Sequence, residues 1–196
     1  MISITDKIKY IESSNDPLSA EIGVIDSNGE KWLFDVGNDK TKIAELTDTY
    51  NVVLSHFHLD HVGNLDDIKI NKLYVSKFTY EHTNRGIIVE DDIYINNLHI
   101  FLVPSSHTKG CLGLEIDEEY AFLGDAIYSK SNDEFYIYNT QLLKEEIDLL
   151  KKLKANKLLV SHEKGFILDK EVVILMLEQI YALREKDNPL ILVPKR

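Results

Sequence analysis

The stretch NVVLSHFHLDH, residues 51–61, decides the fold of this chain. Its first five residues form an apolar run that is typical of a β-strand buried on both faces. The next six residues contain four side chains that can bind metal ions: His56, His58, Asp60 and His61. We expect an extended loop in which His56, His58 and Asp60 point to one side and His61 to the other. A loop of this kind offers ligands to two adjacent metal ions.

Three further side chains of the same kind stand directly after other predicted strands. They are His107 after residues 98–103, Asp125 after residues 120–123 and His162 after residues 157–161. Polar residues often follow strands, so each of them alone is a weak indication. Together with the histidine-rich loop, they predict one shared site at the ends of four strands.

The remaining pattern predicts a layered α/β architecture. Strands are expected over residues 7–12, 21–26, 30–36, 72–76, 86–96 and 112–116, and Asn28-Gly29 is a typical hairpin turn. Helices are expected over residues 40–48, 77–82, 141–154 and 170–185, the last with Asp169 as its N-cap. Strands come first, strand–helix alternation follows, and two helices come last, which favours central sheets with helices outside.

Length and composition restrict the classes of function. With 196 residues and no repeat, linker or low-complexity tract, we expect a single domain over residues 1–196. The net charge of −11 would repel a phosphate backbone, so we expect no nucleic-acid partner. No stretch approaches the ~20 apolar residues that span a bilayer, so we expect no membrane partner either. The lone Cys111 and an N-terminus without a signal-peptide pattern are typical of a cytoplasmic protein.

The order of these motifs resembles that of a known family. HFHLDH at residues 56–61, then a single His107, a Gly-Asp pair ending in Asp125 and a final His162 resemble the ligand order of the metallo-β-lactamase superfamily. The resemblance runs from FDVG, residues 34–37, to His162 and therefore covers most of the chain. It implies an α/β fold of the metallo-β-lactamase type, which is a four-layer αββα sandwich with its site at one edge between two sheets.

The same resemblance assigns the site residues. It implies that three histidines hold a first metal ion: His56, His58 and His107. One aspartate and two histidines would hold a second ion: Asp60, His61 and His162. Asp125 would bridge the two ions. Asp35, in FDVG, is expected to support the histidine loop. His and Asp ligands suit two divalent metal ions, zinc first, with iron and manganese as alternatives.

The implied activity is that of a dinuclear zinc hydrolase. A hydroxide that bridges the two ions would attack a small ester, thioester or lactone, and Asp60 would orient that hydroxide as a catalytic residue. The spacing from Asp125 to Tyr128 is similar to that in the acyl-homoserine lactonases of this superfamily. It implies a catalytic phenol that hydrogen-bonds the substrate carbonyl. The expected partner is therefore a small-molecule substrate.

Two other functions stay open on the sequence. One is a mononuclear iron enzyme of the persulfide dioxygenase type, which would use fewer of these ligands. The presence of the full set of ligands favours two ions over one. The other is a non-catalytic metal-binding domain. Glyoxalase II enzymes share the ligand set but add a helical C-terminal domain, whereas only one helix and a tail are expected after His162. That last helix is apolar around much of its girth, which indicates either core burial or the surface of a homodimer.

Overall fold

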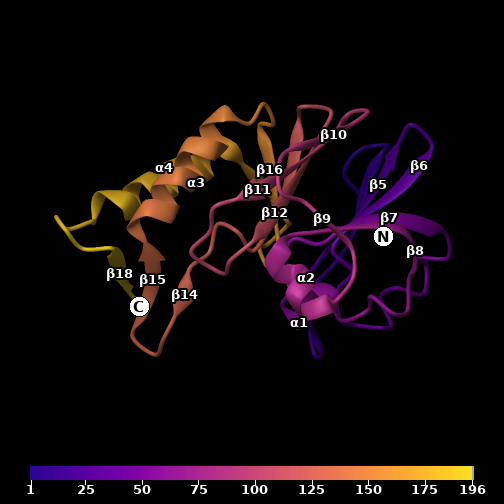
Figure 1. Cartoon of the computed structure of the whole chain (residues 1–196), viewed down its shortest axis with the longest axis horizontal. Coiled ribbons are helices and arrows are strands. Elements are labelled where there is room, and N and C mark those ends of the chain that lie inside the picture. Colours follow the sequence, from indigo (N-terminus) through magenta and orange to yellow (C-terminus); the bar gives the residue numbers. More distant parts are fainter. Residues whose placement is uncertain (196) are drawn as a thin grey trace.

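Two large β-sheets form the centre of the molecule (Figure 1), for which a computed structural model describes residues 1–195. The first sheet has seven strands in the order β1 (Ile2–Ser3), β2 (Ile8–Ile11), β5 (Ile22–Ser27), β6 (Glu30–Phe34), β7 (Thr49–Val53), β8 (Lys69–Val75) and β9 (Ile87–Ile88). The second has six strands in the order β10 (Ile93–Ile95), β11 (Leu98–Val103), β12 (Cys111–Ile116), β13 (Tyr120–Gly124), β16 (Lys157–Val160) and β17 (Ile167–Asp169).

Helices and two small sheets complete the chain. The helices are α1 (Leu59–Val62), α2 (Lys77–Thr83), α3 (Thr140–Lys152) and α4 (Lys170–Ala182). One small sheet joins β14 (Lys130–Ser131), β15 (Phe135–Asn139) and β18 (Leu190–Pro194), and the other joins β3 (Ser14–Asn15) and β4 (Leu18–Ser19). The sequence does not predict β15 or β18. Within residues 1–195, every helix is too short or too polar to cross a membrane.

The two large sheets pack face to face because their strands are apolar on both sides. Trp32 and Phe34 of β6 lie in the core between the sheets together with Phe122 of β13, and the ring centroids of Phe34 and Phe122 are 5.3 Å apart. Leu33, between those two residues of β6, lies in a different core on the outer face of the first sheet. Successive side chains of a strand point to opposite faces, so strands covered on both faces read as continuous apolar runs.

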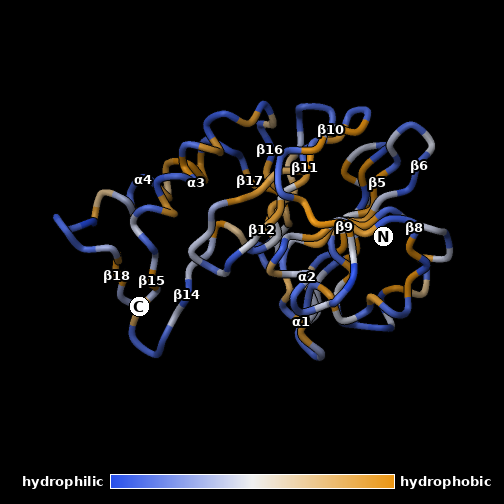
Figure 2. Tube along the Cα trace, in the orientation of Figure 1, coloured by the Kyte–Doolittle hydropathy of each residue, from blue (hydrophilic) through white to orange (hydrophobic). Residues whose placement is uncertain are grey.

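The helices form the outer layers. Leu143 of α3 and Leu177 of α4 pack with Ala121 and Leu123 of β13, so α3 and α4 cover the outer face of the second sheet (Figure 1). Leu65 and other residues near α1 cover the outer face of the first sheet. Figure 2 shows apolar residues concentrated along the central strands and polar residues along the loops. The predicted sandwich of two central sheets with outer helical layers is confirmed.

The helix predicted over residues 40–48 is wrong, because this segment forms consecutive turns. The carboxylate of Asp39 accepts hydrogen bonds from the backbone N–H and the hydroxyl of Thr41, at 2.9 and 2.7 Å. The Leu46 N–H then donates to the Ile43 carbonyl three residues earlier, whereas an α-helix needs a separation of four. Local side-chain hydrogen bonds therefore replace the helical ones.

Helix α4 follows Asp169, as predicted, but ends at Ala182 rather than near residue 185. The Asp169 side chain makes no capping hydrogen bond. One face of α4 is buried and carries Val173, Ile174 and Leu177, and the opposite face is exposed and carries Val172, Leu175 and Met176. Core burial accounts for one face only. That a second copy of the chain covers the other face stays a prediction.

The strand ends bring the predicted site residues to one place. His56, His107, Asp125 and His162 follow the carboxyl ends of β7, β11, β13 and β16. The ends of β7 and β13 touch, because a Cβ at Gly124 would lie only 2.6 Å from the Oγ of Ser55. Gly124 also has a φ of +56°, a conformation that side chains disfavour. Glycine at this position lets the two sheets approach each other beneath the site.

A carboxyl group lies in the apolar layer between α3 and the second sheet. Glu146 is fully buried on the same face of α3 as Leu143 and Leu150, and neither of its carboxyl oxygens has a hydrogen-bond partner. Burial raises the pKa of Glu146 well above its usual value of 4.5. An unpaired buried carboxyl group destabilises a fold in either protonation state, and more so when it is charged.

We predict that Glu146→Leu raises the free energy of unfolding by about 1–3 kcal/mol at pH 8. A raised pKa means that wild-type stability is fully present below pH 4.5 and declines as the pH rises toward the folded-state pKa. The gain should therefore be larger at pH 8 than at pH 4.5, as measured by urea unfolding at both values. Glu146→Gln, which stays neutral but polar, should remove the pH dependence with a smaller gain. Equal gains for Glu146→Leu at both pH values would contradict this account.

Candidate metal centre

The structure brings the seven predicted side chains together as two neighbouring groups. The first group holds the histidines His56, His58 and His107, and the second holds Asp60, His61, Asp125 and His162. Within each group, one nitrogen or oxygen atom of every residue lies within 4.8 Å of the others. Each group therefore converges on a space that a single ion can fill.

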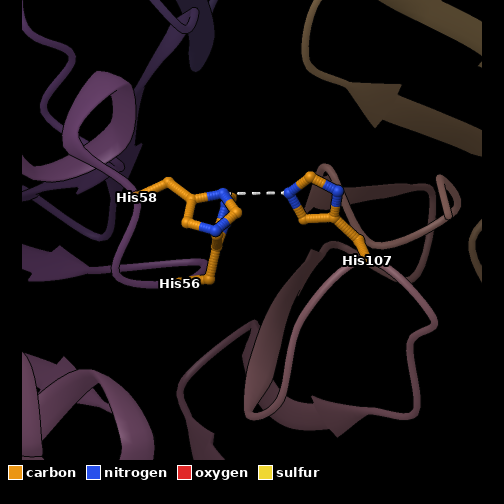
Figure 3. Close-up of side chains that lie close together, drawn as sticks. All are labelled: His56, His58 and His107. Atoms are coloured by element: carbon orange, nitrogen blue, oxygen red, sulfur yellow. Dashed lines mark hydrogen bonds between the residues drawn. The ribbon is translucent and has the colours of Figure 1, made fainter. Parts of the chain in front are cut away.

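The first group consists of neutral nitrogen donors only. The Nδ1 atom of His58 lies 2.9 Å from Nε2 of His56 and 3.0 Å from Nε2 of His107. His56 and His58 follow β7, and Figure 3 shows His58 and His107 pointing toward each other from two separate parts of the chain. Because His107 follows β11 of the second sheet, this group exists only when the two sheets are packed together.

The second group mixes carboxylates with histidines. The Oδ2 atom of Asp60 lies 3.1 Å from Nε2 of His162 and 3.5 Å from Nε2 of His61. Asp125 lies between the groups, since its Oδ1 is 3.5 Å from Nε2 of His61 and its Oδ2 is 3.4 Å from Nε2 of His107. One oxygen of Asp125 thus faces each group, which is the placement that a bridging carboxylate needs.

The extended loop predicted for residues 56–61 is wrong in one respect. Asp60 and His61 lie in the single-turn helix α1, so Asp60 joins His61 in the second group instead of lying beside His56 and His58. In a helix, successive side chains are rotated by about 100°, whereas in an extended chain they alternate. The helical turn thereby divides four neighbouring residues between two groups.

Asp35 supports the histidine loop by hydrogen bonds, as expected. Its fully buried carboxylate accepts from the N–H and the hydroxyl of Ser55, both at 2.7 Å, and lies 2.7 Å from Nδ1 of His61. The Ser55 hydroxyl also lies 3.0 Å from Nδ1 of His56. With their Nδ1 atoms engaged, both histidines turn Nε2 toward the site, which is the common arrangement around protein-bound metals.

Two buried polar atoms at the centre of the site have no hydrogen-bond partner. They are Nε2 of His61 and Oδ1 of Asp125. Buried donors and acceptors are almost always paired, so unpaired atoms that face each other need an explanation. A divalent cation between them would provide the missing partner, and imidazole and carboxylate are suitable ligands. The residues of the second group therefore fit a metal ion, and the three histidine nitrogens that converge in the first group fit another.

The two groups differ in charge in the metal-free protein. Burial lowers the pKa values of His56, His58 and His107, so the first group is neutral and has free lone pairs at pH 7. In the second group, burial lowers the pKa of His61, but the negative charges of Asp35 and Asp125 raise it to about 10. His61 must therefore release a proton before a metal ion can bind to it.

The other two pKa values of the second group reflect the Asp60–His162 hydrogen bond. This bond raises the pKa of His162 above its usual value. Burial raises the pKa of Asp60, but the hydrogen bond from His162 and the charge of His61 outweigh burial, so this pKa lies below its usual range.

Tyr128 lies beside the second group, but its hydroxyl is already engaged. It donates to the backbone carbonyl of Ser161 at 2.7 Å and lies 3.2 Å from a carboxylate oxygen of Glu163. Burial and the nearby carboxylates raise the pKa of this phenol, so it stays protonated at pH 7. A hydrogen bond from Tyr128 to a substrate would require the bond to Ser161 to break.

Other residues that could bind metal lie outside the two groups. His82 stacks on Phe57 with ring centroids 3.7 Å apart, and His99 stacks on Tyr94 with centroids 4.3 Å apart. Cys111 is buried in an apolar layer, which raises the pKa of its thiol to about 12. The sequence does not indicate the roles of Ser55 or of Glu21, which accepts a hydrogen bond from the backbone N–H of His162.

Comparison with known proteins supports this picture of the fold. No protein-family model matches the sequence. The hydroxyacylglutathione hydrolase of Buchnera aphidicola subsp. Schizaphis graminum is 28% identical over 120 residues, which cover 57% of this chain and 47% of the relative. The match thus spans about half the length of that enzyme.

Solved structures match over a larger part of the chain. The metallo-β-lactamase DIM-1 has a TM-score of 0.69 at 14% identity, covering 92% of this chain and 95% of its own. The chemotaxis sensor ODP, whose structure contains a peroxy diiron species, has a TM-score of 0.68 at 15% identity, covering 93% and 94%. At these identities the likeness establishes the fold, so this chain has the metallo-β-lactamase fold.

We predict that Asp35→Asn lowers the pKa of His61 from its wild-type value of about 10 in the metal-free protein, because Asp125 alone then opposes the effect of burial. Asparagine tolerates the φ of +60° at this position, so the backbone should keep its shape. NMR titration of the imidazole measures the change. Asp66→Asn, which removes an exposed carboxylate paired with Arg85, is the control.

The same pair predicts a pH dependence of stability. Because the folded-state pKa of His61 is raised, its contribution is fully present below pH 6.5 and is lost as the pH rises through about 10. Metal-free wild type should lose stability over this interval in urea unfolding, and Asp35→Asn, which keeps only the contribution of Asp125, should lose less. Parallel curves for the two proteins would contradict the pairing.

Proposed function

We propose that this protein, a chain with the metallo-β-lactamase fold, is a cytoplasmic metal-dependent hydrolase that acts on a small ester, thioester or lactone. One observation carries the proposal: seven His and Asp side chains form two adjacent groups, and Asp125 of the second group also faces His107 of the first. Two buried atoms that face each other within the second group have no hydrogen-bond partner. The name of the Buchnera relative, a hydrolase, supports the reaction class.

Each group would hold one divalent ion. His56, His58 and His107 would hold the first, Asp60, His61 and His162 would hold the second, and Asp125 would contact both. Two such ions supply hydroxide at neutral pH and stabilise the negative charge that develops on a carbonyl oxygen. Zinc suits both donor sets, and iron and manganese are alternatives.

The protein's own groups would position the reacting atoms. Asp60 has a lowered pKa and therefore stays ionised, so its carboxylate can accept a hydrogen bond from the nucleophilic hydroxide and orient it. The Asp35–His61 hydrogen bond would fix the imidazole of His61 and keep its Nε2 directed at the site. No Ser or Cys nucleophile is needed, and Cys111 has too high a pKa to serve as one at pH 7.

A redox function at the same residues is the second candidate. The match to a sensor with a diiron species shows that this fold can hold iron in another protein. A mononuclear iron oxygenase of the persulfide dioxygenase type would leave most of the second group without a role. Elemental analysis of the purified protein separates the two functions: about two zinc or manganese ions per chain support hydrolysis, and one iron with oxygen uptake supports the alternative.

We predict that His58→Ala abolishes metal binding at the first group and reduces hydrolysis to background, because the Nδ1 atom of His58 lies between its two partners. Metal content is measured by elemental analysis, and activity on a panel of esters, thioesters and lactones with the native metal. His99→Ala, a histidine outside both groups, should keep the metal content and activity of wild type. Full activity of His58→Ala would overturn the proposed function.

We predict that Tyr128→Phe lowers kcat by about 10–100-fold while leaving metal content unchanged, as the loss of a hydrogen bond to the reacting carbonyl would do. The hydrogen bond from the Tyr128 hydroxyl to the Ser161 carbonyl suggests a second role for this hydroxyl, which is to hold the loop that carries His162. If the hydroxyl only holds the His162 loop, the variant should bind metal more weakly, with a kcat restored by excess metal. Steady-state kinetics with and without added zinc distinguish the two roles.

A further inference from the structure

One short segment near the N-terminus contacts both halves of the second group. The backbone N–H of Ala20 donates to the carbonyl of Asp60 at 2.9 Å. The next residue, Glu21, accepts a hydrogen bond from the backbone N–H of His162 at 3.0 Å through its Oε2. Asp60 and His162 come from opposite sheets and face each other across 3.1 Å, so this segment links the two elements that must stay together.

The backbone at His162 needs this support. His162 has a φ of +64°, the left-handed region that costs roughly 1 kcal/mol or more for a side-chain-bearing residue. The preceding Ser161 N–H still bonds to Gly124, but the parallel pairing of β13 and β16 has ended at Val160. The N–H of His162 is therefore satisfied by a side chain, and Glu21 supplies it.

Glu21 is built into this position. Its side chain is 95% buried, and its second oxygen accepts from the hydroxyl of Ser13 at 2.8 Å. Each carboxylate oxygen thus has a defined donor, which leaves the side chain little freedom to move. Glu21 does not belong to either group of candidate metal ligands.

We propose that Glu21 is a positioning residue for the second metal ion, and this inference rests on the proposed function. By holding the N–H of His162, it fixes the left-handed turn that directs the imidazole toward Asp60. The hydrogen bonds of Glu21 go to Ser13 and His162 and not to a residue of the first group, so we expect the effect to be specific to one ion. Removing a partner that orients a ligand typically weakens metal binding by about 10–100-fold.

The test measures metal binding rather than activity. Wild type and Glu21→Ala, each stripped of metal, are titrated with Zn²⁺ in competition with a chromophoric chelator, and then with Mn²⁺. Wild type should bind two ions. Glu21→Ala should bind the first ion with wild-type affinity and the second about 10–100-fold more weakly. The melting temperature of the metal-free proteins reports any general loss of stability.

Two further variants separate the hydrogen bond from charge and from folding. Glu21→Gln keeps an oxygen that can accept from His162, so it should restore binding of the second ion to within a few-fold of wild type. It also keeps the test valid if Glu21→Ala fails to fold. Glu12→Gln removes a carboxylate that lines the same cavity of about 450 Å³ as Glu21 and His162. As the matched control for charge, it should bind both ions as wild type does.

The outcomes distinguish this inference from the proposed function. If wild type binds two ions and Glu21→Ala binds both with unchanged affinity, the role of Glu21 is overturned while the dinuclear site stands. Equal weakening of both ions also overturns it, because that result indicates general damage. Loss of the second ion in Glu21→Gln as well as in Glu21→Ala assigns the effect to charge and overturns the hydrogen-bond role. If wild type binds fewer than two ions, the proposed dinuclear function falls, and the inference falls with it.

Discussion

The buried carboxylate of Asp35 is the interaction on which the rest of the site depends. It accepts two hydrogen bonds from Ser55 and one from His61, all at 2.7 Å, and it has no access to water. A buried carboxylate costs several kcal/mol unless such partners surround it. Moving Ser55 or His61 away would leave the charge of Asp35 unpaired, so both residues are held in place. Since Ser55 precedes His56 and His61 ends the HFHLDH segment, one side chain fixes both ends of the histidine loop.

The backbone leaves three strands through the same unusual conformation. Asp35, Gly124 and His162 each follow or end a strand with φ between +56° and +64°. This conformation turns the chain sharply at the edge of the sheet, and Gly124 additionally lets β13 approach Ser55. The strain is tolerated because hydrogen bonds and packing hold each turn, as for His162 and Glu21. The free-energy cost of these three backbone turns is therefore tied to the packing that places the strand ends around the site.

The two candidate metal positions are chemically unequal. Three neutral histidines, of which His56 is fully buried, form the first, and two carboxylates with two histidines form the second. In the metal-free protein the second position carries a proton on His61, which offsets part of the negative charge of Asp35 and Asp125. A divalent ion would replace that proton, so the buried carboxylates are compensated in both states. The arrangement keeps the charged second position stable at the ends of the strands of the two packed sheets.

Local patterns in the sequence predicted the class of fold and the seven His and Asp side chains that converge in the structure. Apolar runs that end in His or Asp are local patterns, and the spacing within HFHLDH needs no tertiary information to be recognised. The helix predicted at residues 40–48 is wrong because side-chain hydrogen bonds of Asp39 stabilise turns there. In so short a segment, the helical spacing of apolar residues is too weak a signal to reveal this competition. The tertiary structure was needed to show that the Tyr128 hydroxyl bonds to Ser161 and that Glu21 holds the backbone N–H of His162. These contacts join residues from 33 to 141 positions apart, and such pairings are fixed by the packing of the two sheets rather than by any local sequence pattern.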